Sequence, residues 1–256
     1  MIDNDLNNNL LKTKRQRTIL NLLTDKGTIT LKELEEKLSC SRITIQRDLV
    51  ALEEKGLLDR VHGGATTKEY NLASHDHHNR LLIHTNKKKK ICRKAVTLIE
   101  PNTIIFMDAS STVFFMSEYV FPEKVRAVTT GYDTFLALQK IYKIQPILTG
   151  GRINPDNRTL VGPEAVHTAK QFYFDAVFIS ADSVIENQGV YSSDSETAEI
   201  SSLVIRQTNK VFLLFDSSKE KNRQGAKVCR IGEITKLITD EPDNQYLKKL
   251  FKGNIL

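Results

Sequence analysis

Residues 41–49 read Ser-Arg-Ile-Thr-Ile-Gln-Arg-Asp-Leu, and this stretch decides the fold of the N-terminal part of the chain. Apolar side chains in and just after it recur at the i, i+4, i+7 spacing of a buried helical stripe: Ile45, Leu49 and Leu52. At about 100° per residue, Gln46 and Arg47 project away from that stripe. The pattern therefore predicts an amphipathic helix that turns a polar face outward near its N-terminus.

Three helices are expected within the first part of the chain. They are centred on the apolar residues Ile19, Leu20, Leu22 and Leu23, on residues 31–38, and on residues 42 to about 55. Gly27 and Gly56 end the first and the third helix. Thr30 and Glu33 form a capping box for the second, and Ser41 caps the third. Short turns thus separate three consecutive helices.

A small hairpin follows the third helix. Residues 57–61 have strand character, residues 62–64 form a turn, and residues 65–67 return as the paired strand. Two helices joined by a short turn, the second with polar side chains in its first turns, are typical of proteins that place a helix in the major groove of DNA.

The third helix supplies the side chains expected to read bases. Arg47 is the strongest candidate, because arginine can bond guanine bidentately, and Gln46 can do the same to adenine. In the hairpin, Arg60 and His62 are expected at the adjoining backbone or minor groove. The full set of candidate DNA contacts is Ser41, Arg42, Thr44, Gln46, Arg47, Arg60, His62 and Gly63. A module for protein interactions with solvated charges is the alternative interpretation.

Composition agrees with an anionic partner. The chain has 256 residues, a net charge of +6 and a pI near 9.1, which favours polyanions because bound phosphates release their counterions. Its three cysteines lie far apart, so neither a disulfide nor a zinc site is expected. No signal peptide or membrane span is recognisable, and a cytoplasmic protein without membrane contact is expected.

The chain is expected to divide into four segments. These are a disordered tail over residues 1–12, a winged helix-turn-helix DNA-binding domain over 13–68, a linker over 69–86 and a larger domain over 87–256. The linker carries His75, His77 and His78, but no partner ligand lies at metal spacing, so no metal site is predicted. No motif calls for a cofactor.

The larger domain is predicted to be α/β. Apolar runs occupy residues 104–107, 125–128, 144–148, 176–179 and 211–215, with helical patterns between several of them. Continuous apolar strands indicate a mainly parallel sheet covered on both faces, whose ligand crevice lies at the carboxyl ends of the strands. The fold class expected is α/β, with the winged helix-turn-helix unit in front of a Rossmann-like domain.

A loop rich in serine and threonine follows the first of these runs. Asp108-Ala109-Ser110-Ser111-Thr112 opens an expected helix, so its amides and hydroxyls are placed to hold a phosphate. Ser and Thr are also ordinary helix caps, and the loop alone leaves both interpretations open.

The N-terminal motif resembles the DeoR family of bacterial transcription regulators. The resemblance rests on residues 41–49, on Leu52-Glu53 and Gly56, and above all on Arg-Val-His-Gly-Gly-Ala over residues 60–65. It continues through the second domain, which it implies is similar to ribose-phosphate isomerase and adapted to bind a phosphorylated sugar. The family commonly has two arginines where this chain has Gln46-Arg47, so a different operator is expected.

The resemblance also implies an effector site at the strand ends. Its candidate residues are Asp108, Ser110, Ser111, Thr112, Thr129, Gly150, Gly151, Glu196, Asp216 and Lys219. Glu196 is suited to accept sugar hydroxyls and Lys219 to hold the phosphate charge. Two departures from the family pattern, Ala109 in place of glycine and Ser180-Ala181-Asp182 after the fourth strand, lie at this pocket.

The function expected is a sequence-specific regulator, a repressor of a carbohydrate operon that a sugar phosphate controls, acting as a dimer or tetramer on duplex DNA. The alternative is a sugar-phosphate isomerase with an appended basic domain, in which Glu196 is the base and Lys219 the electrostatic stabiliser. The basic run Lys87–Lys90, expected just before the second domain's first helix, is interpreted as a solvated helix face. Near DNA it would add unspecific phosphate contacts.

Overall fold

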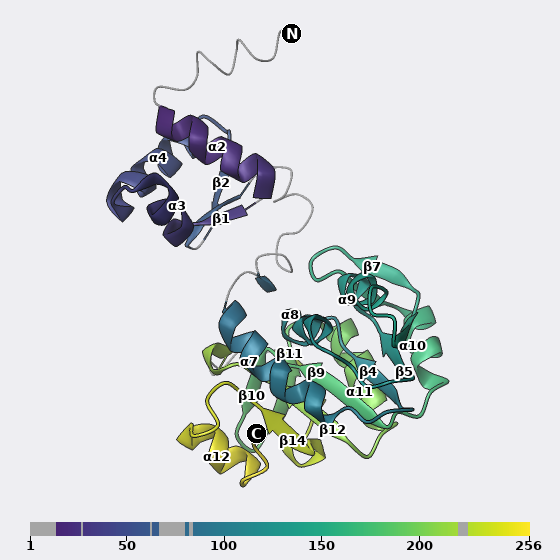
Figure 1. Ribbon diagram of the computed structural model, residues 1–256. Helices are drawn as coiled ribbons and strands as arrows, with labels where there is room; N and C mark the ends of the chain where they lie inside the picture. The colour runs from purple at the N-terminus through teal and green to yellow at the C-terminus, as the bar shows by residue number, and fades with distance from the viewer. Residues whose placement is uncertain (1–13, 27, 62, 67–79, 82–83, 220–224) are drawn as a thin grey trace. The chain divides into compact units, whose positions relative to one another are not determined.

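The computed structural model describes residues 14–26, 28–61, 63–66, 80–81, 84–219 and 225–256. The chain divides into two compact units, Met1–His75 and Asp76–Leu256, which are drawn in Figure 1. The predicted tail and most of the predicted linker, including His75, His77 and His78, lie outside the described residues. The finer domain boundaries stay predictions.

The N-terminal unit has the predicted three helices and one strand more than predicted. Its elements are α2 (Lys14–Lys26), β1 (Thr28–Thr30), α3 (Leu31–Leu38), α4 (Arg42–Glu54), β2 (Asp59–Val61) and β3 (Gly64–Thr66). The strands form an antiparallel sheet in the order β1-β3-β2. The pattern missed β1 because it is only three residues long and is stabilised by pairing with β3, more than thirty residues away.

Local sequence signals set the ends of these helices. The capping box is confirmed, since the amide of Glu33 donates to the Thr30 hydroxyl at 3.2 Å and the Thr30 amide donates to the Glu33 carboxylate at 3.0 Å. The predicted stripe is also confirmed, because Ile45, Leu49 and Leu52 are all at most 2% exposed. These side chains fix which face of α4 is buried.

A buried carboxylate attaches α4 to α2. Asp48 is 6% exposed and forms an ion pair with the Arg15 side chain, while the Gln16 amide donates to it at 3.4 Å. Hydrogen bonding to Asp48 raises the pKa of Arg15. A buried carboxylate is stable only when it is paired in this way, so the contact fixes how α4 is set against α2.

The C-terminal unit is an α/β structure. Its elements are α7 (Thr85–Ala95), η1 (Val96–Leu98), β4 (Ile104–Met107), α8 (Ser111–Phe114), η2 (Phe115–Glu118), β5 (Val125–Thr129), α9 (Tyr132–Leu138), β6 (Ile144–Leu148), β7 (Arg152–Asn154), β8 (Thr159–Val161), α10 (Pro163–Lys170), β9 (Ala176–Ser180), β10 (Ser183–Ile185), β11 (Gly189–Ser192), α11 (Ser195–Ile205), β12 (Val211–Leu214), η3 (Ser217–Lys219), β13 (Ala226–Cys229), η4 (Ile231–Glu233), β14 (Lys236–Ile238) and α12 (Gln245–Phe251).

Six of these strands make the predicted parallel sheet, in the order β14-β12-β9-β4-β5-β6. Alternate side chains of β4 enter two different cores: Ile105 and Met107 pack in one, Phe106 in the other. Helices on both sides of the sheet complete these cores, as α7 and α11 illustrate in Figure 1. The continuous apolar runs are therefore explained by burial on both faces.

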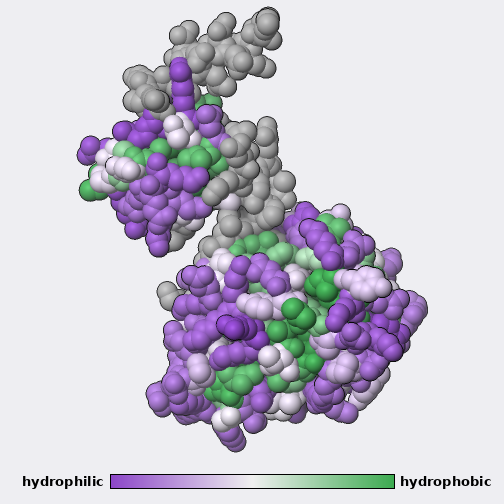
Figure 2. Space-filling model, viewed as in Figure 1, coloured by the Kyte–Doolittle hydropathy of each residue, from purple (hydrophilic) through white to green (hydrophobic). Residues whose placement is uncertain are grey.

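The surface of both units is mainly hydrophilic in the view of Figure 2, and a band of apolar side chains crosses the larger unit. Within the described part of the chain, no helix combines the length and apolar character needed to cross a membrane.

One expectation about α7 is wrong. The basic run Lys87–Lys90 lies inside this helix rather than before it, and it is not simply a solvated face. Lys88 is 3% exposed, Lys87 lies 3.3 Å from a carboxylate oxygen of Asp240, and Lys89 lies 2.7 Å from Glu118. Tertiary contacts within the larger unit thus bury Lys88 and pair Lys87 and Lys89 with carboxylates.

Candidate functional site

The outward face of α4 carries the predicted base-reading side chains. Gln46 and Arg47 are exposed, and neither has a hydrogen-bond or ion-pair partner among the described residues. They line a shallow hollow of about 490 Å³ together with Ile43, Val50, Ala51, Glu54 and Arg60. The buried stripe on the other side of the helix holds this face toward solvent, where a large polar partner can reach it.

The start of α4 departs from the expected cap. Ser41 occupies the N-cap position, but its side chain makes no capping hydrogen bond to the helix backbone. Its hydroxyl instead lies 2.9 Å from the hydroxyl of Thr44. Both residues and the exposed Arg42 thus lie at the N-terminal end of α4, where the amides of a helix and its dipole favour an anion.

The hairpin is attached to α4 through Glu53. The Arg60 amide donates to the Glu53 carboxylate at 2.9 Å, and the Arg60 guanidinium lies 3.7 Å from it. Gly63 has a φ of 89° and its carbonyl accepts from the Leu31 amide at 2.7 Å. A side chain at Gly64 would lie 2.1 Å from the Ile29 carbonyl, so close strand pairing requires glycine there. His62 lies outside the described residues.

A second candidate site lies in the larger unit, where β4, β9 and β12 end. It is a polar cavity of about 60 Å³ lined by Arg80, Asp108, Ala109, Ser110, Ser111, Asn157, Thr159, Ser180, Ala181, Asp182, Ser192, Ser193, Asp194, Thr197 and Lys219. Four predicted effector residues, Asp108, Ser110, Ser111 and Lys219, are among them. The parallel sheet brings these together because its strands end at one edge.

Asp108 ties two strand ends together at the base of the cavity. One of its carboxylate oxygens accepts from the Ser110 amide at 2.9 Å, and the other accepts from the Ser180 amide at 2.6 Å. Burial raises the pKa of Asp108, whereas these hydrogen bonds oppose the rise. Ser110 caps α8 by accepting from the Val113 amide at 3.1 Å. Ala109 has no positive φ, so the fold tolerates its methyl group.

Two lysines bring positive charge to this region: Lys219 lines the cavity, and Lys88 is bonded to two of its lining residues, Ser111 and Arg80. The Lys219 ammonium donates to the Ser180 hydroxyl and the Ala181 carbonyl, both at 3.0 Å. The Lys88 ammonium donates to the Ser111 hydroxyl at 3.1 Å and to the Arg80 carbonyl. Burial, followed by the neighbouring Lys219 charge, lowers the pKa of Lys88 to about 8. Burial also lowers the pKa of Lys219.

Lys88 supports this site through Ser111 and was not among the predicted effector residues. It was grouped with a solvated run, yet it shares one helical stripe with the buried residues Ile91, Cys92 and Ala95, at i+3, i+4 and i+7. That spacing was the signal that could have found it, because a lysine on an apolar stripe must be buried with its charge matched.

Other lining residues of the cavity are rich in oxygen acceptors. The amide and hydroxyl of Ser193 both donate to Asp182 at 2.8 Å. Burial acts to raise the pKa of Asp182, but these hydrogen bonds lower it overall. Asp194 caps α11 by accepting from the Thr197 amide at 3.1 Å, and Asn157 lies within 3.4 Å of both. Asp182 belongs to the Ser180-Ala181-Asp182 segment that the family resemblance placed at this pocket, whereas Asn157 and Ser193 had no local motif to mark them.

The other predicted effector residues do not line the cavity. Thr112 is fully buried in α8, and Asp216 is buried beside Lys219, whose charge it stabilises. Thr129 accepts from the Gly131 amide at 3.0 Å. Gly150 and Gly151 have φ of 76° and 97° and form a tight turn. Glu196 forms an exposed ion pair with Arg152. Effector contact by these residues stays a prediction.

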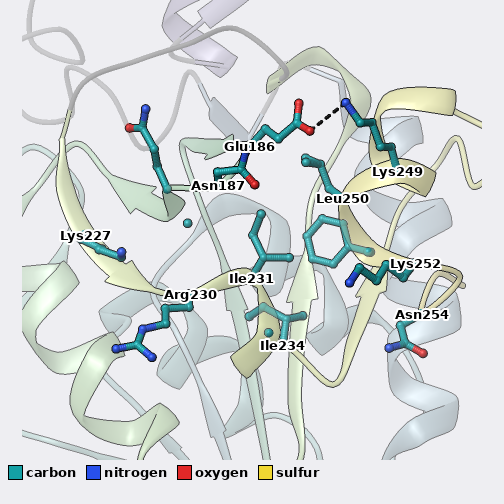
Figure 3. A pocket seen from close by; sticks show the side chains of 14 residues that line it. Glu186, Asn187, Lys227, Arg230, Ile231, Ile234, Lys249, Leu250, Lys252 and Asn254 are labelled. Carbon is teal, nitrogen blue, oxygen red and sulfur yellow. Dashed lines mark ion pairs between the residues drawn. The ribbon is translucent and has the colours of Figure 1, made fainter.

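A wider hollow of about 690 Å³ lies elsewhere in the larger unit (Figure 3). Its side chains include Lys227, Arg230 and Lys252, and Lys249 pairs with Glu186 at 2.8 Å across one side of it. None of the predicted effector residues lines this hollow. The smaller cavity is the better candidate because enclosed cations and convergent hydrogen-bonding groups, rather than volume, give a site its specificity.

Comparison with known proteins decides the family. Residues 83–241 match the model of the DeoR C-terminal sensor domain, and residues 15–70 match that of the DeoR-like helix-turn-helix domain. The chain belongs to the DeoR family. It is therefore a DNA-binding transcription regulator with a sensor domain, as the sequence motifs predicted.

Several relatives cover nearly the whole chain. The HTH-type transcriptional regulator GolR of Listeria innocua is 31% identical over 240 residues, 93% of this chain and 94% of that protein. The L-fucose operon activator of Escherichia coli is 29% identical, covering 90% and 96%. The lactose phosphotransferase system repressor of Streptococcus mutans is also 29% identical, covering 94% and 97%.

Solved structures show weaker similarity. Ribose 5-phosphate isomerase A from Methanocaldococcus jannaschii is 18% identical over 54% of this chain and 55% of that chain, with a TM-score of 0.39. The sorbitol operon regulator SorC from Klebsiella pneumoniae is 12% identical over 80% and 88%, with a TM-score of 0.35.

Proposed function

We propose that this regulator is a repressor of a carbohydrate operon, that α4 reads the operator, and that a phosphorylated sugar bound in the cavity of the larger unit releases it from DNA. The observation that carries the effector assignment is the Lys219 ammonium in the cavity lining, together with the buried Lys88 ammonium bonded to the lining residue Ser111, among carboxylates and hydroxyls. The cavity thus offers a ligand both cationic groups and oxygen acceptors.

The cationic groups suit a phosphate. Burial disfavours the charged forms of Lys88 and Lys219, as their lowered pKa values indicate. An anion placed between them would offset that cost, because a charge-assisted hydrogen bond is strongest where solvent is excluded. The hydroxyl of Ser111, already bonded to Lys88, is a further phosphate donor.

The oxygen acceptors suit a polyol. Asp182, Asp194 and Asn157 present carboxylate and amide oxygens, which accept hydrogen bonds from sugar hydroxyls. A small molecule with an anionic end and a hydroxylated body would match both kinds of group. The relatives named for L-fucose and lactose systems support a carbohydrate operon, and the lactose relatives support repression.

Binding must open the cavity, since about 60 Å³ is too small for a sugar phosphate. The contact that an incoming phosphate would compete with is the one between Lys88 and the Arg80 carbonyl. Arg80 lies five residues after the boundary between the two units, which falls at His75. If this contact is present in the DNA-binding state and lost in the ligand-bound state, the ligand has a different affinity for the two states. Such a difference in affinity is what allows a ligand to regulate DNA binding.

The isomerase alternative has less support. It needs Glu196 as a base beside Lys219, but Glu196 is paired with Arg152 and is not among the cavity's lining residues. We therefore propose that the cavity binds its ligand without converting it, and that no enzyme activity accompanies regulation. A dimer or tetramer, with repeated half-sites on the operator, completes the proposal.

The test is selection of bound fragments from the source genome with the full-length protein, followed by mobility-shift titration with phosphorylated pentoses and hexoses. We expect specific fragments next to carbohydrate genes and release by one compound or a few. Absence of any enriched fragment would overturn the DNA assignment. Release by none of the compounds would overturn the effector assignment, and robust isomerisation of a releasing compound would favour the enzyme.

A further inference from the structure

Ile43 is an exposed apolar side chain on a helix face that is otherwise polar at this end. It is the second residue of α4 and is 64% exposed, whereas Ile45, two residues on, is fully buried. No other large apolar side chain described between residues 14 and 66 is exposed. Its exposure therefore calls for a partner outside the unit, and it does not contribute to the core.

The surroundings of Ile43 indicate what that partner is. Gln46 and Arg47 follow at i+3 and i+4, so they lie beside Ile43 on the same face, and all three line the hollow that Arg60 borders. Arg42 adds a further exposed charge next to Ile43. Of the carboxylates nearby, Glu53 is paired with Arg60 and Glu54 lies at the far end of α4. The net charge around the apolar group favours a polyanion.

Among the base edges of duplex DNA, only one kind carries an apolar group that could pack against Ile43. In the major groove the 5-methyl group of thymine is the apolar feature, while guanine and adenine present the acceptors and donors that suit Arg47 and Gln46. We infer that Ile43 is a specificity-determining residue that packs against a thymine methyl group in the operator. The inference rests on the proposed reading of DNA by α4.

The helix geometry limits where that thymine lies. Ile43 and Arg47 are four residues apart, a rise of about 6 Å along α4. Base pairs are about 3.4 Å apart along the duplex. The thymine is therefore expected within about two base pairs of the base that Arg47 contacts, in each half-site.

The experiment uses the full-length protein and duplexes selected from a random pool. Each thymidine of the tightest duplex is replaced in turn by deoxyuridine, which lacks only the methyl group, and affinity is measured by fluorescence anisotropy. We expect one position in each half-site where the replacement weakens binding about fourfold, the effect of one buried methyl group. The Ile43→Ala protein should bind the thymidine and deoxyuridine duplexes equally well.

Two matched variants complete the design. Lys32→Ala removes an exposed side chain of α3 and should keep the full discrimination, and Ile43→Val should keep part of it. Full discrimination by Ile43→Ala, or no deoxyuridine-sensitive position near the Arg47 contact, would overturn the inference and leave DNA binding intact. If no sequence is enriched at all, the proposed function fails together with it.

Discussion

The two candidate sites keep their cations in opposite environments. On α4, Arg47 and Arg42 are exposed. In the larger unit, Lys88 is 3% exposed and its pKa is lowered to about 8 by burial. Exposed charges act through long-range attraction that salt screens, whereas enclosed charges act at contact distance and discriminate strongly between ligands. One site is thus built to attract a polyanion, the other to select a small anion.

The largest effect is expected at the enclosed site. Lys88→Met removes the buried ammonium and should weaken binding of the releasing sugar phosphate by about 1.5–3 kcal/mol, the value of a hydrogen bond to a charged group. Operator affinity without ligand should also fall, because the variant lacks the contact between Lys88 and the Arg80 carbonyl whose loss is proposed to release the protein from DNA. Isothermal titration calorimetry and a mobility shift measure the two, with Lys90→Met, an exposed lysine of the same helix, as the control. Unchanged ligand affinity in Lys88→Met would contradict the proposal that this enclosed cation selects a small anion.

A somewhat smaller effect is expected at the exposed site. Arg47→Ala should cost about 1–3 kcal/mol of operator binding and much less on random duplex, because base contacts give specificity and phosphate contacts do not. Ligand affinity should not change. Lys37→Ala, on α3, is the control. Equal losses on operator and random DNA would argue against base reading by Arg47.

The affinity of the larger unit for its ligand should depend on pH through the titration of Lys88. The charged form of Lys88 is lost as pH rises through about 8, and a bound phosphate favours that form, so ligand affinity should fall above about pH 8, by up to about tenfold per unit. Calorimetry from pH 6.5 to 9.5 measures the trend, and Lys88→Met should flatten it.

The same linkage has the opposite sign for folding. The pKa of Lys88 is lower in the folded chain than the ordinary value of 10.5. The unfolded chain therefore holds more protons between about pH 8 and 10.5, and this residue adds stability as pH rises through that window. For the ligand-binding prediction, an affinity that rises with pH would contradict the assignment of Lys88 to the phosphate site.

The smallest effect is expected from the basic run of α7. Lys89→Ala and Lys90→Ala should change operator affinity by less than about 0.5 kcal/mol, because Lys89 pairs with Glu118 and Lys90 donates to the Asp240 carbonyl. The salt dependence of DNA binding should be the same as for the unchanged protein. A shallower dependence would show that the run contacts phosphates.

Local patterns determined the helices of the N-terminal unit and the strands of the large sheet. The Thr30–Glu33 capping box involves neighbours in sequence, and the stripe of Ile45 and Leu49 repeats within a few turns. Five of the six strands of the parallel sheet were recognisable because burial on both faces leaves a continuous apolar run. Such signals are written in short stretches of chain, and sequence reasoning can use them directly.

Only the tertiary structure decided the membership of the cavity. Lys88 reaches Ser111, 23 residues away, and Lys219 reaches Ser180, 39 residues away. Glu196, which follows a suitable strand, is paired with Arg152 instead of facing the cavity. Asp48 contacts Arg15 across two helices. A binding site depends on which side chains meet where strands end, and the parallel sheet brings together residues that no local spacing connects.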